Sequence, residues 1–225
     1  RRQRQMCIRD SILPGNSGNS YGFYANDKGT DNQISQSAPS YFCTGEWRVP
    51  NSSGDWSFTN IYHLNFFFAN VLPRFGEDLN GSGNTISGDL KSIRHYIGEL
   101  YTLRALEYFK RYQAFGDYPI VTDPLTDNME ILTDAAKRSP RNEVARFILS
   151  DLDKAAILMD GKDFQTTRIN RDVALLLKSR VALFEATWLK YFKGSAFVPN
   201  GEGWPGKTKA VSYTHLRAHE TLSDL

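Results

Sequence analysis

The most constraining feature of this sequence is an apolar stripe that repeats at helical spacing through residues 89–112. Apolar side chains recur there every three or four positions, which places them on one side of an α-helix for about five turns. A stripe of this length must be covered by other structure, because a single helix would leave it in water. The helix is expected to end near Gly116. Its stripe consists of Leu90, Ile93, Ile97, Leu100, Leu103, Leu106 and Phe109.

Three other segments share this periodicity and carry helix-boundary signals. The first is expected to begin at Asp55 and to stop at Pro73, and the next to begin at Ser139-Pro140, an N-cap and a first-turn proline. Asn170 is expected to cap the last. The residues predicted to face inward are Phe58, Ile61, Tyr62, Asn65, Phe68 and Leu72; Val144, Phe147, Ile148, Leu152, Ala155 and Leu158; and Val173, Leu176, Leu177, Val181, Phe184 and Trp188.

Four amphipathic helices in two sequential pairs predict an all-α fold of stacked helical hairpins, similar to tetratricopeptide arrays. A linker of about 25 residues separates the pairs, so the spacing does not satisfy a strict repeat of about 34 residues. Residues 12–54 are rich in Gly, Ser, Asn and Pro and carry scattered aromatic residues, which indicates long irregular loops that lean on the helices. Little sheet is expected, because no alternating apolar pattern of any length occurs.

Both ends of the chain are expected to be foreign to the protein. Residues 1–11 and 211–225 back-translate to DNA that resembles a transposase-type sequencing adapter, in opposite orientations. The whole chain has 27 basic and 25 acidic residues, and removing the five arginines and three carboxylates of these ends leaves 22 of each. A neutral remainder gives no reason to expect a nucleic-acid partner. We therefore predict one domain over residues 12–210, as a piece of a longer protein.

No metal, cofactor or catalytic centre is predicted. His63 and His95 fall on different predicted helices, and Cys43 has no histidine near it in the sequence. Residues 201–208 match the phosphate-loop pattern and end in Lys207-Thr208. Pro205 has no N–H to aim at a phosphate, and no strand is expected before this segment. We interpret the match as chance.

The second helical segment and its exit resemble a known family. Residues 98–109, GELYTLRALEYF, and residues 115–120, FGDYPI, are similar to the signature of SusD/RagB-type proteins. Three further stretches resemble family motifs in the same order: Trp56 to Asn70, Arg141 to Ala155 and Arg168 to Phe184. The resemblance covers about residues 20–206, and the family's C-terminal half has no counterpart in this sequence.

The resemblance implies a surface lipoprotein of the bacterial outer membrane that is not an enzyme. Such a protein binds a glycan or other nutrient and delivers it to a SusC-like TonB-dependent transporter. An alternative interpretation is a helical-repeat scaffold that binds only protein and makes no direct ligand contact.

The candidate ligand-binding residues are Trp47, Arg48, Asn51, Trp56 and Tyr41. Tryptophan rings with polar neighbours can stack on sugar rings while the polar groups hydrogen-bond to hydroxyls. The alternative for Trp47 and Trp56 is that they fasten the loop to the helical core.

Three charged residues of the family-like segment are interpreted as scaffold. A buried Arg104 would need a carboxylate partner, and Glu99 and Asp117 are the candidates. Trp188, on the apolar side of the last helix, is expected in the core.

Overall fold

The computed structural model describes residues 12–13, 56–76, 78–161 and 168–205. The chain divides into two compact units, residues 1–60 and 61–225. Within the described residues there is no strand, only an isolated antiparallel bridge between Tyr118 and Ser139. The helices, which apart from the first two residues of α3 belong to the second unit, are α3 (Thr59–Phe75), α4 (Leu90–Phe115), α5 (Met129–Ala135), α6 (Arg141–Leu158) and α7 (Arg171–Phe192).

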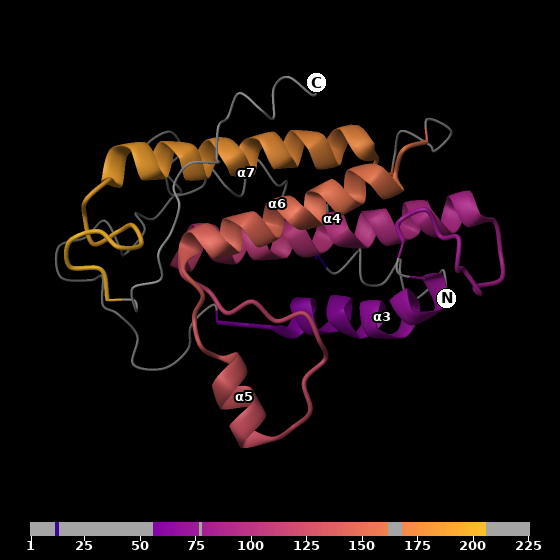
Figure 1. The fold of residues 1–225 in the computed structure, drawn as a ribbon, viewed down its shortest axis with the longest axis horizontal. Helices are drawn as coiled ribbons and strands as arrows, with labels where there is room; N and C mark the ends of the chain where they lie inside the picture. Colours follow the sequence, from indigo (N-terminus) through magenta and orange to yellow (C-terminus); the bar gives the residue numbers. More distant parts are fainter. Residues whose placement is uncertain (1–11, 14–55, 77, 162–167, 206–225) are drawn as a thin grey trace, which may run out of the picture. The chain divides into compact units, whose positions relative to one another are not determined.

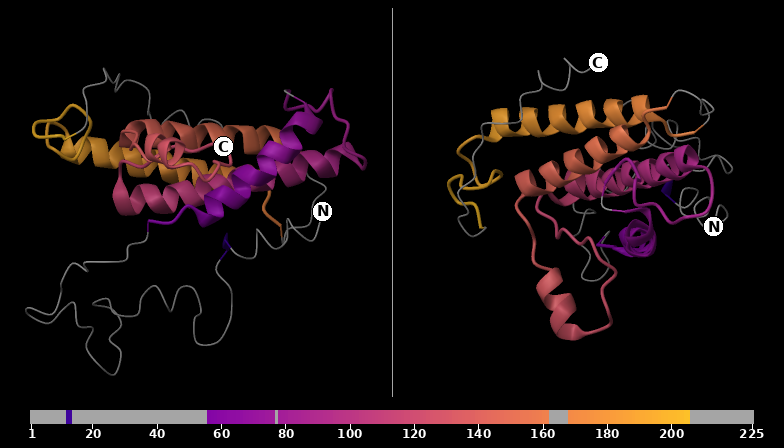
Figure 2. Two further views of the ribbon diagram at one scale, coloured as in Figure 1. Left: turned by 90° about the horizontal axis from the view of Figure 1, so that it is seen from below. Right: turned by 45° about the vertical axis from the view of Figure 1, so that its right-hand side comes forward.

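In the second unit, α6 lies between α4 and α7 and runs antiparallel to both (Figure 1), and the two turned views keep this order (Figure 2). On the other side of α4, the Phe68 ring of α3 lies 4.4 Å from the Tyr101 ring of α4. α4 is buried on most of its circumference from His95 to Tyr112, as expected for a helix covered on two sides. The predicted all-α stack of antiparallel helices is confirmed.

Three predicted helix boundaries are confirmed by their hydrogen bonds and backbone angles. The Asp89 carboxylate accepts a hydrogen bond from Ser92 N at 2.9 Å, which caps α4. Gly116, just beyond α4, has a φ of 69°, which favours glycine. The Asn170 side chain accepts a hydrogen bond from Val173 N at 3.0 Å and caps α7.

Three predicted boundaries are wrong. Trp56 to Phe58 are not helical, so the first helix begins at Thr59, and the predicted cap Asp55 lies outside the described residues. α3 also continues past Pro73 to Phe75, so the proline costs this helix the one hydrogen bond of its missing N–H but does not end it. At α6 the N-cap position is Pro140 rather than Ser139.

The short helix α5 was not predicted. It lies in the segment that the sequence pattern indicates as a linker, away from the three stacked helices (Figure 1). The Asn128 side chain caps it by accepting hydrogen bonds from Glu130 N at 2.9 Å and Ile131 N at 3.4 Å. None of its residues is buried, so it leaves no apolar stripe in the sequence.

Several residues predicted to face inward are exposed: Tyr62 is 46%, Leu90 39%, Val173 43% and Leu176 69% exposed. For α7 the reason is its place in the stack, since it packs on α6 and barely touches α4. Trp188 is half-buried rather than in the core, and its Nε1 donates a hydrogen bond to Phe197 O at 2.9 Å. The buried positions of α7 are Ala174, Val181, Ala182 and Glu185.

Among the described residues, no helix combines the length and the hydropathy needed to cross a membrane.

Candidate functional site

Most of the predicted ligand-binding residues lie outside the described residues: Tyr41, Trp47, Arg48 and Asn51. Trp56 is described and lies just before α3, where its side chain is 36% exposed. Its ring meets that of Phe58 edge to face, with centroids 6.0 Å apart. An exposed indole beside a second ring offers a surface on which a sugar ring can stack.

The invariably charged Arg104 lies in a buried network at the centre of the stack. Its Nε and Nη2 donate to the two oxygens of Asp151 on α6, at 2.7 and 2.8 Å, and its Nη1 donates to Asn65 Oδ1 on α3 at 3.2 Å. Burial alone would lower the pKa of Arg104, but the hydrogen bonds and charge of Asp151 outweigh it and raise that pKa. The predicted buried ion pair is therefore confirmed, but the predicted partners Glu99 and Asp117 are wrong.

Glu99 has basic partners from two segments. Arg168 donates from Nε and Nη2 to its two oxygens, at 2.8 and 2.6 Å, and His95 Nε2 lies 3.3 Å from Glu99 Oε1. Burial raises the pKa of Glu99, but the hydrogen bonds from His95 and Arg168 outweigh this effect and hold it below its ordinary value. Glu99 thus fastens the segment before α7 to α4.

Asp117 has a different structural role, because its Oδ1 accepts a hydrogen bond from Arg141 N at 2.8 Å. Pro140, at the N-cap position of α6, has no side-chain oxygen to make this bond, and Asp117 supplies it from the turn after α4.

The Arg141 side chain lies in a second buried network. It donates from Nη2 to Glu185 Oε2 on α7 at 3.0 Å and to Tyr112 Oη on α4 at 2.5 Å, and it stacks on Trp188 with its Cζ 4.2 Å from the ring centroid. Burial raises the pKa of Glu185 and lowers that of Arg141, so desolvation opposes both charges. All three helices of the stack meet in this network.

The scaffold interpretation of Glu99, Arg104 and Asp117 is confirmed, since each holds one element to another. The partners Asp151, Arg168 and Glu185 were not predicted. Asp151 and Glu185 lie on helix faces that their own periodicity does not distinguish as charged sites, and Arg168 lies in the segment before α7.

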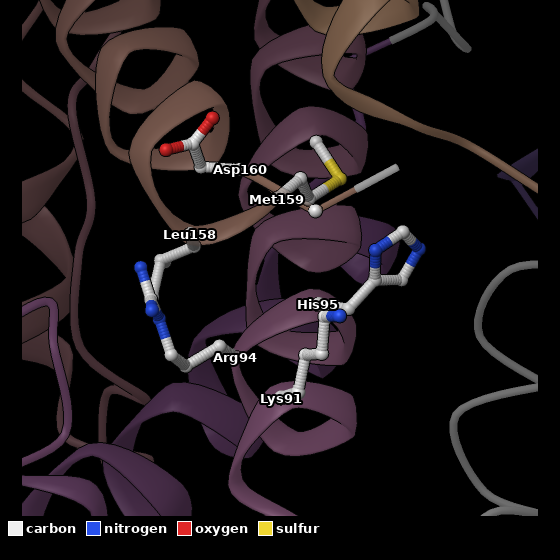
Figure 3. A pocket seen from close by; sticks show the side chains of 7 residues that line it. Lys91, Arg94, His95, Leu158, Met159 and Asp160 are labelled. Atoms are coloured by element: carbon white, nitrogen blue, oxygen red, sulfur yellow. The ribbon is translucent and has the colours of Figure 1, made fainter. Parts of the chain in front are cut away.

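A small cavity, which we call the cationic hollow, lies between the first turns of α4 and the end of α6. Its volume is about 220 Å³. Figure 3 shows Lys91, Arg94 and His95 on one side of α4, facing the segment that follows α6. The lining residues are Lys91, Arg94, His95, Leu158, Met159, Asp160 and Gly161.

This hollow was not predicted from the sequence. A signal was present, because Lys91, Arg94 and His95 are spaced i, i+3, i+4 and therefore share one face of a predicted helix. What the sequence could not show is that the end of α6 lies opposite this face.

Comparison with known proteins gives one curated relative and several solved structures. The chain is 27% identical over 117 residues to SusD-like protein P2 of Formosa agariphila. The aligned region covers 52% of this chain and 23% of that protein. No protein-family model matches the chain.

Two solved structures from Bacteroides fragilis illustrate the likeness. A SusD-like protein is 27% identical with a TM-score of 0.45, covering 60% of this chain and 24% of that one. A SusD superfamily protein is 24% identical with a TM-score of 0.43, covering 57% and 24%. The chain thus spans about a quarter of the length of these relatives.

Proposed function

We propose that this chain belongs to the SusD-like family, binds a carbohydrate and leaves its glycosidic bonds intact. The observation that carries the proposal is the sequence similarity to a curated SusD-like protein over 117 residues. It agrees with the family motifs, which occur in order along the helical part of the chain.

The use of the charged residues supports a binding role. In the described part of the chain, the buried carboxylates of Glu99, Asp151 and Glu185 each bind an arginine, which rigidifies the helical stack. Carbohydrate binding requires a rigid surface, exposed rings and hydrogen-bonding groups, and it needs no group that makes or breaks bonds. The helical stack supplies such a surface.

The proposed contact residues are Trp56 together with Tyr41, Trp47, Arg48 and Asn51. The exposed indole of Trp56 supports its assignment, since a buried ring could not stack on a sugar. We further propose that the protein acts at the outer-membrane surface as a lipoprotein and delivers its ligand to a SusC-like transporter. This part rests on the family resemblance alone.

Affinity electrophoresis of the full chain in gels containing neutral or acidic polysaccharides tests the proposal. At least one polysaccharide should retard the chain, and Trp56→Ala should weaken the affinity about two- to tenfold, as expected for the loss of a ring contact of about 0.5–1.5 kcal/mol. Tyr191→Ala is the matched control, because Tyr191 is an aromatic residue that is 74% exposed on α7. Equal effects of the two substitutions would contradict the assignment of Trp56.

The alternative function is a protein-binding scaffold. A variant with alanine at both Trp47 and Trp56 distinguishes this scaffold function from carbohydrate binding. If this variant keeps its polysaccharide affinity but no longer associates with the transporter, the scaffold function is correct.

A further inference from the structure

Residues 78–89, between α3 and α4, carry side-chain oxygens at the spacing of a calcium-binding loop (Figure 1). The twelve-residue pattern has Asp at position one, Asp or Asn at positions three and five, Gly at position six and Glu at position twelve. The segment reads DLNGSGNTISGD, which places at positions one, three, five, six and twelve the residues Asp78, Asn80, Ser82, Gly83 and Asp89. Ser82 and Asp89 depart from the pattern, but each keeps a side-chain oxygen.

The structure gives this segment the setting of such a loop, with a helix on each side. α3 ends at Phe75, shortly before Asp78, and α4 begins at Leu90, directly after Asp89. Calcium-binding loops of this class join two helices, and their twelfth residue belongs to the start of the second helix. The spacing in the sequence and the helix–loop–helix arrangement are separate observations, and they agree.

The loop is folded so that its first half lies against the start of α4. Gly81, at position four, has a φ of 74°, which favours glycine. A Cβ at Gly81 would lie 2.8 Å from Leu90 Cδ1. Asn80 and Ser82 flank Gly81, and Asp89 directly precedes Leu90. The residues at positions three, five and twelve therefore belong to one small region, and their side chains are exposed.

The carboxylate of Asp78 is held in place at position one. Its Oδ1 accepts hydrogen bonds from Gly81 N at 2.8 Å and Ser82 N at 3.0 Å, and its Oδ2 accepts one from Ser82 Oγ at 2.6 Å. An ionised carboxylate has about four acceptor positions, so these three bonds leave room for a metal ion. Turning the Ser82 hydroxyl toward the metal would free one more position.

Both carboxylates are ionised at neutral pH. The hydrogen bond from the Ser82 side chain lowers the pKa of Asp78 below its ordinary value. The Ser92 hydroxyl and N–H donate to Asp89 Oδ2 at 2.8 and 2.9 Å and lower the pKa of Asp89 in the same way. The loop thus presents two negative charges to a cation without a cost of deprotonation.

We propose that residues 78–89 bind a calcium ion. No metal site was predicted from the sequence, so this proposal revises that expectation. Hard oxygen ligands suit Ca²⁺, and water would complete its six to eight ligands. The protein ligands are two carboxylates, two neutral side-chain oxygens and the backbone carbonyl at position seven, from Asp78, Asp89, Asn80, Ser82 and Asn84 respectively. The proposal does not depend on the proposed binding of a carbohydrate.

The composition of the site predicts weak binding. It has two carboxylates, and the Asp89 side chain is shorter than the glutamate that binds Ca²⁺ with both oxygens in this position. The charges of Arg94 and Lys91 act on Asp78 and Asp89, and they are the weakest of the effects on each pKa. Arg94 Nη2 also donates to Ile157 O at 3.0 Å. We therefore expect a dissociation constant of about 10⁻⁴–10⁻³ M, the weak end of the range for such loops.

An NMR titration of the isotope-labelled full chain with calcium chloride tests the proposal. Amide signals of residues 78–89 should shift and saturate, with half-saturation at about 10⁻⁴–10⁻³ M. Magnesium chloride should require concentrations at least about tenfold higher, because Mg²⁺ demands near-octahedral geometry and gives up its water reluctantly. Shifts that do not saturate by about 10 mM calcium, or that magnesium matches at equal concentration, would overturn the proposal.

Asp89→Asn separates the metal ligand from the helix cap. Asparagine caps a helix as well as aspartate does, so the helical content in circular dichroism should be unchanged. Loss of the charge should weaken calcium binding about tenfold or more. Asp172→Asn is the matched control, because Asp172 is an exposed carboxylate at the start of another helix, α7, and should leave the affinity unchanged.

Equal effects of Asp89→Asn and Asp172→Asn would contradict the proposed site, since they would indicate a general effect of net charge. Asn80→Ala removes a neutral ligand and should also weaken calcium binding, whereas an unchanged affinity would exclude position three from the site. The calcium titration and the polysaccharide gels are separate measurements, so either proposal can fail while the other holds.

Discussion

At the scale of single residues, a buried ion pair between Arg104 and Asp151 ties α4 to α6. The position of Arg104 in a long apolar stripe predicts that it is buried and needs a carboxylate. The partner could not be predicted, because Asp151 lies 47 positions away on α6 and becomes a neighbour only when the helices stack. Asp117 and Glu99, nearer in sequence, bind other groups.

Asp151→Asn tests the importance of this pair. The substitution leaves the Arg104 guanidinium buried without its countercharge and should lower the free energy of unfolding by about 3–5 kcal/mol in urea. Asp134→Asn is the control, since it removes an exposed ion pair with Lys137 and should leave the midpoint unchanged. A small effect of Asp151→Asn would show that the network contributes little to stability.

The lowered pKa of Glu99 predicts that the free energy of unfolding depends on pH. Its pKa in the folded protein is below the ordinary value of 4.5, so ionised Glu99 stabilises the fold above that pH and this contribution is lost as the pH falls. Protonated Glu99 resembles glutamine. The difference in unfolding free energy between the wild-type chain and Glu99→Gln should therefore be largest near neutral pH and should disappear at acid pH. A difference that stays constant from pH 7 to pH 3 would contradict this role.

At the scale of helices, periodicity and local capping signals predicted α4, α6 and α7 and the capping residue Asn170, because these signals are local. It failed for α5, which buries nothing, and for the first turns of α7, where the apolar residues Val173 and Leu176 are exposed. A stripe shows that a face is apolar, but the neighbouring helices decide which part of it is covered.

Gly98 allows α4 and α6 to approach closely. A Cβ at this position would lie 2.6 Å from Met159 Cγ and 3.2 Å from Ala155 O. Gly98→Ala should therefore destabilise the fold by about 1–2 kcal/mol in urea unfolding, even though alanine favours a helix by about 1 kcal/mol. Adding Met159→Ala should make the cost of Gly98→Ala smaller, because it removes the closest contact. Additive effects of the two substitutions would show that the close approach is unimportant.

At the scale of the whole molecule, the family motifs predicted the helical stack, and the similarity to a SusD-like protein agrees with them. The predicted contact residues were inferred from loop composition, and of these the described part of the chain contains Trp56, with an exposed ring. The cationic hollow was missed, because it joins the start of α4 to the segment after α6, more than 60 positions later. Local patterns do not reveal a site that two distant segments form together.

The central claim is that this chain holds a carbohydrate without altering it. Calorimetric titration of the full chain with the polysaccharide that retards it most, followed by chromatography of the recovered sugar, tests this claim most directly. We expect saturable binding and a recovered polysaccharide of unchanged length. Shortened products that accumulate with time, or an absence of binding to every polysaccharide tried, would contradict the account.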